Sequence, residues 1–498
     1  MTDSLLAALS AWKPFRALVV GDFMLDQLLY GSAERLSADA PVPILHVTES
    51  QDRPGGAANV CMDLVALKGT VLAFGVTGSD AHSAALRAAL AAQGVNADGL
   101  IADPSRPTTV KQNLIGRAQA RHPQKMFRVD FESREPLSAT VVEHLLTAIV
   151  SAIRDVDVVC IEDYDKGVCT EDLCQGVIKL CRAAAKPVFV DPARLHDYAK
   201  YRGANVITPN RTEAEVATGL RTHGEASVEH NLALATALLN DFGLEAVVLT
   251  LDRHGALLLE RGGEPAAIPT VARHVYDVTG AGDMFLAGLA AARANGLTWH
   301  DSVRLANAGA GLEVEIFGVE PISLERIHHS LLDLASKDMG KLRTLEQATI
   351  EVRAQRAKGG RVVFTNGCFD VLHAGHVSLL EKARAHGDFL VVGLNDDHSV
   401  RCLKGEGRPI NSQEDRARVL GALQSVGSVV LFGDPTPIAL IEALRPDTLV
   451  KGADYTKDRV VGADFVESYG GRVALVDLVQ GRSTTSTLER LRSAARGT

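Results

Sequence analysis

Four uninterrupted apolar runs in the middle of the chain constrain its fold more than any other feature. They occupy residues 156–163, 187–191, 205–209 and 246–250, and segments with the residue pattern of helices lie between them. Short apolar runs without polar alternation are typical of strands buried on both faces, as in a parallel sheet covered by helices. The sequence therefore predicts an α/β fold for this part of the chain.

Polar residues follow these runs where the strands are expected to end. Ligands of open α/β sheets bind beyond the carboxyl ends of the strands, so these residues are candidates for a site. Asn210 and Glu213 also begin a predicted helix with the spacing of a capping pair. Glu213 can in addition hold Mg²⁺ through water, and Asn210 can bond a phosphate oxygen. The full set is Asp163, Tyr164, Lys166, Asp191, Asn210, Arg211, Thr212 and Glu213.

A glycine-rich turn at residues 277–283 is the strongest candidate for catalysis. Gly280, Ala281 and Gly282 are small, so the backbone N–H groups can approach an anion closely. The residues from 284 onwards are helical in pattern, and a helix N-terminus favours phosphate. Asp283 would repel that phosphate, which suggests that it faces the other reactant and takes the proton of an attacking hydroxyl. The alternative is an Asp N-cap after a glycine turn.

The N-terminal part predicts a first strand at 15–22 and contains candidates for binding a sugar. Asp22 and Asp26 can contact a polyol or merely form turns, and residues 41–48, with two prolines, suit an edge strand. Gly55, Gly56 and Asn59 make a second turn before a helix, and Asn59 can bond sugar hydroxyls. Two strands near 108–116 and 125–132 flank a basic loop. Its cations form solvated hairpin faces, or one or two of them grip a substrate phosphate: Lys111, Arg117, Arg121, Lys125 and Arg128.

The pattern changes near residue 337, which divides the chain into domains at 1–337 and 359–498, joined by a linker and helix at 338–358. The second domain opens with a strand at 361–365 and a turn that carries His373 and His376. Their spacing suits two imidazoles converging on one phosphate, and no Cys/His cluster nearby favours zinc. Basic and hydroxyl residues at later loops are candidates to hold a triphosphate: Lys404, Lys451, Ser483, Thr484, Thr485 and Ser486.

Composition limits the partners. The net charge of −9 over 498 residues argues against a nucleic-acid or anionic-membrane binder. No signal peptide and no apolar stretch long enough to span a bilayer are evident. The seven Cys lack CxxC pairing, which predicts reduced thiols in a cytoplasmic protein.

Two resemblances add to this interpretation. Residues 15–335 resemble the ribokinase-like carbohydrate kinases, through Asp277–Asp283 (DVTGAGD), Asn210–Glu213 (NxxE) and the GGxxN element that ends at Asn59. Residues 360–498 resemble the cytidylyltransferase-like nucleotidyltransferases, through HxGH at 373–376 and RSTTS at 482–486. In this order the two resemble the family of bifunctional heptose 7-phosphate kinases and heptose 1-phosphate adenylyltransferases of lipopolysaccharide core synthesis.

The resemblance implies a ribokinase-like α/β sandwich with a β lid, followed by a smaller Rossmann-like α/β domain. It implies ATP with Mg²⁺ as cofactor, Asp283 as base, residues 280–283 as anion hole, and residues 210–213 at ATP and magnesium. Asp26, Gly55, Gly56 and Asn59 would face the sugar, and the lid at 108–131, with Lys111 and Arg128, would cover it and pair in a homodimer. His373 and His376 would stabilise the α-phosphate.

Three alternatives stay open at this level. The same architecture can act on another phosphosugar, or with CTP in place of ATP. A non-catalytic nucleotide sensor is the third, although Asp283 and both His residues are present. Val278 and Met284 replace hydroxyl residues common in the wider kinase family, which puts a monovalent-cation contact in doubt but not the role of Asp283.

Overall fold

The computed structural model describes residues 2–117, 124–221, 227–270, 275, 277–316, 319–453 and 455–477. It divides into two compact units. One comprises Ala11–Ile327, and the other comprises Met1–Ser10 together with His328–Thr498. Among the described residues, no helix combines the length and the apolar character needed to cross a bilayer.

The first unit is built on a nine-stranded sheet in the order β13-β12-β11-β10-β9-β8-β1-β4-β5. Neighbouring strands pair in parallel except at β12, which pairs antiparallel with both β11 and β13. The four predicted central strands are therefore confirmed, as β8 to β11. The strands are β1 (Phe15–Gly21), β4 (Gly69–Thr77), β5 (Asn96–Ala102), β8 (Val158–Glu162), β9 (Val188–Asp191), β10 (Val206–Ile207), β11 (Ala246–Thr250), β12 (Ala256–Glu260) and β13 (Ala266–Ile268).

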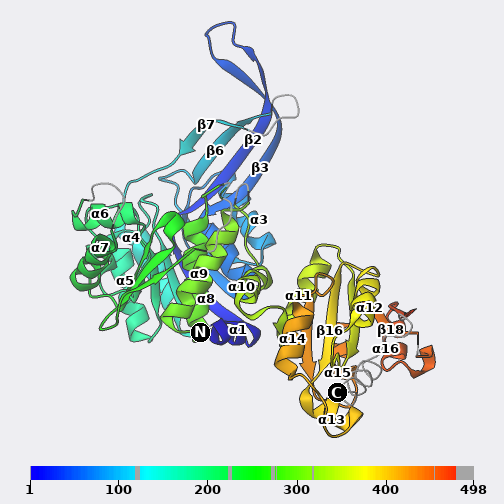
Figure 1. The fold of residues 1–498 in the computed structure, drawn as a ribbon. Helices are drawn as coiled ribbons and strands as arrows, with labels where there is room; N and C mark the ends of the chain where they lie inside the picture. Colours follow the sequence, from blue (N-terminus) through cyan, green and yellow to red (C-terminus); the bar gives the residue numbers. More distant parts are fainter. Residues whose placement is uncertain are drawn as a thin grey trace, which may run out of the picture. The chain divides into compact units, whose positions relative to one another are not determined.

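Helices cover both faces of this sheet (Figure 1). Helices α4, α5 and α7 bury Leu145, Leu173 and Leu238 against one face, in a core shared with Leu18 and Ile161. Helices α2, α8 and α9 pack together on the opposite face. The helices are α2 (Ala57–Ala66), α3 (Ala81–Ala92), α4 (Ala139–Ala152), α5 (Glu171–Ala183), α6 (Arg211–Thr218), α7 (Val228–Asp241), α8 (Ala281–Ala294) and α9 (Trp299–Glu313). Helix α10 (Leu324–Met339) begins in this unit, and its residues from His328 onwards belong to the second unit.

A separate four-stranded sheet projects from this unit (Figure 1). Its order is β3-β2-β6-β7, so β3 and β7 are its edge strands. The antiparallel pair β6 and β7 is the hairpin that the sequence predicts, and the proline-bearing segment lies in edge strand β3. We call this sheet the lid; its strands are β2 (Phe23–Leu36), β3 (Pro43–Gly56), β6 (Thr109–Gly116) and β7 (Gln124–Phe131). Arg121, one of the predicted basic residues, lies outside the described residues.

The second unit holds a six-stranded parallel sheet in the order β14-β17-β16-β15-β18-β19. Helices α11, α15 and α16 cover one face, and α12 and α14 cover the other. The strands are β14 (Leu342–Arg343), β15 (Val362–Gly367), β16 (Phe389–Asn395), β17 (Ser428–Phe432), β18 (Thr448–Gly452) and β19 (Arg472–Val476). The helices are α11 (Leu345–Ala357), α12 (Ala374–Arg384), α13 (Asp397–Lys404), α14 (Gln413–Gly421), α15 (Ile438–Leu444) and α16 (Ala463–Ser468).

The segment at 338–358, which the sequence analysis treats as a linker and connecting helix, contributes to this second sheet domain. Its strand β14 pairs with β17, and its helix α11 buries Ala348 and Val352 in the core. Most residues of this segment are polar because they lie on the exposed side of α11. The few apolar residues that pack inward are therefore hard to recognise in the sequence. The helix α1 (Thr2–Ser10) is grouped with the same unit.

Candidate active sites

Asp283 lies at the centre of the first site, in the first turn of α8. Its side chain is 2% exposed and is held from two directions. Asn59 donates from Nδ2 to Oδ2 at 2.9 Å, and the Tyr164 hydroxyl donates to Oδ1 at 2.7 Å. Burial raises the pKa of Asp283 to about 6, while the two hydrogen bonds oppose the rise. The carboxylate is therefore ionised at neutral pH and basic enough to accept a proton.

The turn before Asp283 leaves backbone donors free. Gly280 is the N-cap of α8 with φ of 90°, a left-handed conformation that favours glycine, and no side chain of the described residues caps this helix. The first N–H groups of a helix have no intrahelical partner, so those of α8 are available to an anion. Helix α2 also starts after a glycine, Gly56, with φ of 58°, and its Asn59 reaches Asp283, although the first N–H of this helix, from Ala57, donates to the Asp22 carbonyl at 3.1 Å. The two glycine turns thus present backbone to a common space.

Asp26 faces this space from the lid. It pairs with Arg53 across β3 and with Lys111 across β6. A Cβ on Gly55 would lie 2.7 Å from the Asp26 carboxylate, so a larger residue at that position would displace the Asp26 side chain. Burial raises the pKa of Asp26, and the charges of Lys111, Arg128 and Lys125 lower it, which places these cations around the carboxylate.

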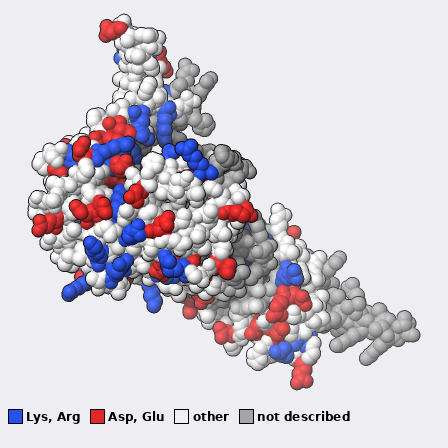
Figure 2. All heavy atoms as spheres, turned by 90° about the vertical axis from the view of Figure 1, so that its left-hand side faces the viewer, with Lys and Arg blue, Asp and Glu red and all other residues white. Residues whose placement is uncertain are grey.

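A pocket under the lid joins these elements. Its lining includes Asp26, Arg53 and Lys125 from the lid strands and Asp277 and Thr279 from the turn before α8. Lys125 lies 3.6 Å from Asp277, whereas Arg128 makes two 2.8 Å bonds to Asp130 on its own strand. On the face drawn in Figure 2, Lys and Arg side chains gather where the projecting lid meets the rest of the unit.

Carboxylates line the opposite side of Asp283. Carboxylate oxygens of Glu162, Asp191 and Asp283 all lie within 4.8 Å of one another, a set that can hold a metal ion. Glu162 and Asp191 are register partners at the carboxyl ends of β8 and β9. Burial raises the pKa of Asp191 well above its usual value, and the charge of Glu213 raises it further, so Glu213 is close to the same cluster.

Asn210 and Glu213 form the predicted capping box at the start of α6. The Glu213 N–H donates to Asn210 Oδ1 at 3.0 Å, and the Asn210 N–H donates to Glu213 Oε2 at 2.8 Å. One carboxylate oxygen of Glu213 stays outside this box. Thr212 is exposed, and Arg211 lies 3.7 Å from Glu215 on its own helix.

For Asp22 the structure favours turn formation over a polyol contact, the two alternatives that the sequence left open. Asp22 is 1% exposed and accepts backbone N–H bonds from Tyr164 at 2.8 Å, Lys166 at 3.2 Å and Val168 at 3.3 Å. Its carboxylate therefore shapes the loop after β8, and this loop carries Tyr164 to Asp283. From the sequence, the position of Asp22 after the first strand could not show whether its side chain contacts a ligand or supports a loop.

The second unit brings His373 and His376 together at the start of α12. Their rings stack with centroids 3.9 Å apart and an angle of 16°, and Phe369 meets the His376 ring edge-on at 5.1 Å. Burial lowers the pKa of His376 to about 4, and the charges of His373 and Lys404 lower it further. His376 is therefore a neutral imidazole at pH 7. Within the described part of the chain no side chain caps α12; the His376 N–H donates to the His373 carbonyl at 2.9 Å, and the N–H groups of Ala374 and Gly375 lie at the helix start beside the two rings.

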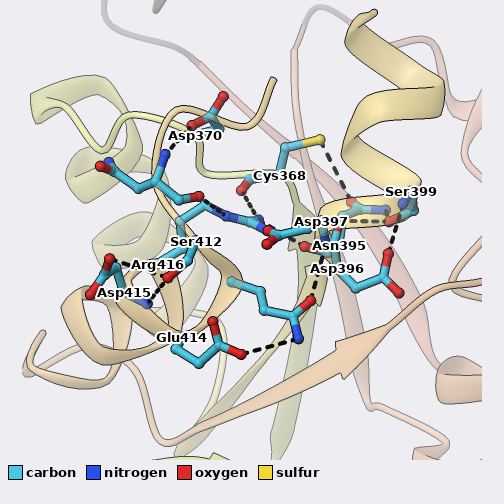
Figure 3. Close-up of polar contacts among 12 residues, drawn as sticks. Cys368, Asp370, Asn395, Asp396, Asp397, Ser399, Ser412, Glu414, Asp415 and Arg416 are labelled. Carbon is cyan, nitrogen blue, oxygen red and sulfur yellow. Dashed lines mark hydrogen bonds and ion pairs between the residues drawn. The ribbon is translucent and has the colours of Figure 1, made fainter. Parts of the chain in front are cut away.

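The loops around this histidine pair are tied together by Arg416 of α14 (Figure 3). Arg416 is 3% exposed and donates to the Cys368 and Asn395 carbonyls, each at 2.7 Å. It also pairs with Asp397 at 2.7 Å. Arg416 thereby fixes the turns after β15 and β16, the two strands whose carboxyl ends border the histidines.

A second carboxylate supports the same turn. Asp370, which is fully buried, accepts from the Ile410 N–H at 2.8 Å and pairs with Arg408 at 2.9 Å. It holds the segment after α13 close to the turn that leads to His373. Arg416 and Asp370 together hold the loops around the two histidines in one arrangement, which we call the loop frame.

The remaining predicted ATP contacts of the second unit are distributed around this frame. Lys404 ends α13 and is exposed, yet its charge reaches His376. Lys451 donates to the Asn366 carbonyl at 3.3 Å and lies 5.4 Å from the Tyr455 ring centre. Ser483, Thr484, Thr485 and Ser486 lie outside the described residues.

Several residues of these sites carry no local sequence signal. Arg416 sits in a charged helix that looks solvent-facing, and Glu313 ends a helix among alternating Glu and Val residues. Asp63 lies one helical turn after Asn59, which is the one clue that it faces the same side of α2. Tyr164 was expected at the sheet edge, but its bond to Asp283 was not.

Comparison with known proteins agrees with both halves of this architecture. Residues 15–325 match the pfkB family of carbohydrate kinases, and residues 364–488 match the cytidylyltransferase-like family. A ribokinase from Arabidopsis thaliana, solved with ribose and ATP, superposes with a TM-score of 0.50 at 22% identity, covering 64% of this chain and 99% of its own. Phosphofructokinase-2 from Escherichia coli, solved with potassium, gives 0.52 at 17%, with 64% and 99% covered. These likenesses show the fold alone.

The fold, the two sites and the matches define a bifunctional enzyme, a ribokinase-like carbohydrate kinase joined to a nucleotidyltransferase. Relatives extend over the whole chain. Bifunctional protein HldE of Syntrophotalea carbinolica is 45% identical over 97% of both chains, and that of Geobacter sulfurreducens is 45% identical over 96% of both. The chain belongs to the HldE family.

Proposed function

We propose that the chain makes ADP-heptose in two separate reactions. The first domain transfers the γ-phosphoryl group of ATP to C1 of D-glycero-β-D-manno-heptose 7-phosphate, giving the 1,7-bisphosphate. The second domain transfers AMP from ATP to heptose 1-phosphate, giving ADP-heptose and pyrophosphate. The HldE family membership and the joining of a kinase to a nucleotidyltransferase support this pair of reactions.

The observation that carries the kinase reaction is the position of Asp283 beside uncapped helix starts and under the lid. In this reaction the C1 hydroxyl oxygen attacks the γ-phosphorus while Asp283 takes the hydroxyl proton. The bond from γ-phosphorus to the bridging oxygen breaks, and ADP leaves. The N–H groups at residues 280–283 stabilise the transferring phosphoryl group. Asn59 and Tyr164 keep Asp283 ionised and aimed, because each donates to one of its oxygens.

The lid side of the pocket is our candidate for the sugar. Asp26 and Asn59 would bond its hydroxyls, since Asp26 Oδ1 and Asn59 Oδ1 are buried with no hydrogen-bond partner among the described residues. Gly55 and Gly56 have no side chains, so the sugar can come close to the backbone there. Lys111, Lys125 and Arg128 supply positive charge for the 7-phosphate.

Magnesium fits the carboxylate side of the site. Carboxylate oxygens are the ligands that Mg²⁺ prefers, and Asp191 and Glu213 offer them at one edge of the sheet. Glu213 would act through water, because one of its oxygens already belongs to the capping box. The bound ion would neutralise charge on the ATP phosphates, while Asn210, Arg211 and Thr212 border the nucleotide.

In the second domain, a phosphate oxygen of heptose 1-phosphate attacks the α-phosphorus of ATP. The bond to the β-phosphate breaks, and pyrophosphate leaves without a covalent enzyme intermediate. His373 and His376 would donate hydrogen bonds to the α-phosphate, with the N–H groups of α12 beside them. Lys404, Lys451 and residues 483–486 would hold the rest of the triphosphate.

We also propose a homodimer formed through the lid, in the cytoplasm where ATP is available. Edge strand β7 is exposed along its length and presents Phe127, Val129 and Phe131 on one face, with Phe127 66% exposed. An exposed apolar edge strand is a ready site for pairing with a second chain. All seven Cys are free thiols, as a reducing compartment requires.

Product mass spectrometry tests the two reactions. The purified chain receives ATP, Mg²⁺ and heptose 7-phosphate, with and without a 7-phosphatase. The bisphosphate alone, converted to ADP-heptose when the phosphatase is present, is the expected result. Turnover of a different phosphosugar, or of CTP in preference to ATP, would keep the fold and overturn this substrate assignment.

A further inference from the structure

A fully buried glutamate directly under the anion-binding turn is not used by the reaction described above. Glu313 is the last residue of α9, and α9 packs against α8, which begins at that turn (Figure 1). Its exposed fraction is 0%. A Cβ built on Gly280 would lie 2.4 Å from Glu313 Oε1. The carboxyl group therefore abuts the backbone that is expected to meet the ATP phosphates.

The surroundings of Glu313 oppose a negative charge. Neither of its oxygens has a hydrogen-bond partner within the described part of the chain. The charges that act on it come from Asp283 at the start of α8 and Asp277 in the preceding turn, and both are acidic. On α2, Asp63 is 1% exposed; burial raises its pKa well above the usual value, and the charge of Glu313 raises it further. Both Asp63 oxygens also lack a partner among the described residues.

We propose that Glu313 is a positioning residue of the kinase site, whose uncharged carboxyl supports the turn at Gly280 and whose ionisation weakens ATP binding there. The reason is electrostatic. The turn binds phosphate through the partial positive charge of its N–H groups. A carboxylate against the other side of the same backbone cancels part of that charge, and burial leaves little solvent to screen it. Burial and the two aspartates raise the pKa of Glu313 to about 8, so the change falls within an accessible range.

This inference rests on the proposed kinase reaction, and it predicts a particular pH dependence. Kinase kcat/KM for ATP should fall by about tenfold or more as the pH rises from 7 to 9.5, because Glu313 ionises. Glu313→Gln and Glu313→Met both stay uncharged, so both should lose this fall. A merely structural role would lower activity at every pH without changing the profile. Two variants are used so that one remains if the other fails to fold.

The experiment measures kcat/KM for ATP from pH 6 to 9.5 in the full-length chain. The matched control is Glu320→Gln, an exposed glutamate seven residues further on, which should keep the wild-type profile. AMP transfer by the same chains serves as an internal control for protein quality. The proposal is supported if the alkaline fall is present in wild type and control but absent in the Glu313 variants. It is overturned if wild type shows no fall, or if the Glu313 variants keep it.

A failure of the substrate assignment gives a different result. In that case wild type would not phosphorylate heptose 7-phosphate at any pH. Binding of a fluorescent ATP analogue is then compared between the wild-type chain and the Glu313→Gln chain, which have the same second site, so any difference between their curves comes from the kinase site. Binding that weakens above pH 8 in wild type but less in Glu313→Gln supports the role of Glu313, and identical binding curves overturn it.

Discussion

Asn59 and Asp283, 224 residues apart in the chain, are joined by a 2.9 Å hydrogen bond between Nδ2 and Oδ2. The bond links α2, which follows the glycine turn beside the lid, to α8, which follows the anion-binding turn. Because Asn59 Oδ1 is buried and has no hydrogen-bond partner among the residues that the structure describes, the same side chain can bond a substrate hydroxyl while it holds Asp283. One amide thus connects the sugar side of the site with the base.

Asp283→Asn should abolish the kinase reaction and spare AMP transfer. The amide cannot take the hydroxyl proton, and a general base contributes about 10²–10⁴-fold to rate. The substitution also changes an acceptor of two hydrogen bonds into a group that can accept at one atom only. Coupled measurement of ADP release and pyrophosphate release on one preparation separates the two activities. A kinase rate near that of wild type would show that Asp283 is not the base.

Tyr164→Phe should shift the acidic limb of the kinase profile to higher pH. The Tyr164 hydroxyl bond lowers the pKa of Asp283 against the effect of burial, so its removal lets this pKa rise above about 6. Since the base works only when ionised, activity then requires a higher pH. We expect a loss of roughly tenfold at pH 6 and a smaller loss at pH 8. An unchanged limb in the kcat/KM profile would argue that Tyr164 does not act on Asp283.

The sequence was sufficient for the features that follow from local pattern. Continuous apolar runs predicted β8 to β11, and Gly280 to Asp283 predicted the turn and the start of α8. Asn210 and Glu213 predicted a capping box that is present atom for atom. Each of these depends on residues a few positions apart, where period and turn chemistry are informative.

Features created by distant packing were missed. Glu313 and Arg416 look like ordinary surface charges, because burial of an acid or a guanidinium depends on which elements cover it. The two alternatives for Asp22 could not be separated from the sequence for the same reason, since its three partners belong to the loop after β8. The antiparallel pair β12 and β13 and the inward face of α11 also depend on neighbours that a single segment does not reveal.

Arg416→Ala should unfold or loosen the second domain and abolish AMP transfer. It removes the bonds to the Cys368 and Asn395 carbonyls and leaves Asp397 without its partner. Breaking a fully buried pair from one side costs about 3–5 kcal/mol, and because the Asp397 side chain is 28% exposed we expect a loss of no more than about 3 kcal/mol. Arg418→Ala, an exposed change two residues further along α14, is the matched control. Thermal unfolding and AMP transfer are measured together, and equal behaviour of the two variants would contradict the bracing role of Arg416.

His376→Ala should reduce AMP transfer by about 10²–10³-fold, the usual effect of removing one donor to a developing charge. The kinase activity of the same chain should stay unchanged. Because the pKa of His376 is lowered to about 4, the free enzyme should show no change in kcat/KM for AMP transfer near pH 6.5 from this residue. His398→Ala, at an exposed position of α13, is the control. Loss of both activities in His376→Ala would instead indicate that the domains are coupled.

Asp63→Asn should stabilise the kinase domain at neutral and alkaline pH. Burial raises the pKa of Asp63 well above its usual value, so the native state binds a proton that the unfolded state has released. The raised pKa of Asp63 therefore adds to the free energy of unfolding in full only below the pKa of the unfolded state. This stabilisation is lost as the pH rises towards the pKa of the folded state. An amide of the same shape has no proton to lose.

The difference between Asp63→Asn and wild type should accordingly be small near pH 4 and grow towards pH 8. Each kcal/mol gained in the free energy of unfolding raises Tm by about 2–4 °C for a domain of a few hundred residues. Asp98→Asn, an exposed change of the same type, should give no such trend. Scanning calorimetry across this pH range decides the question: if the advantage of Asp63→Asn does not grow with pH, Asp63 is not held protonated in the folded protein.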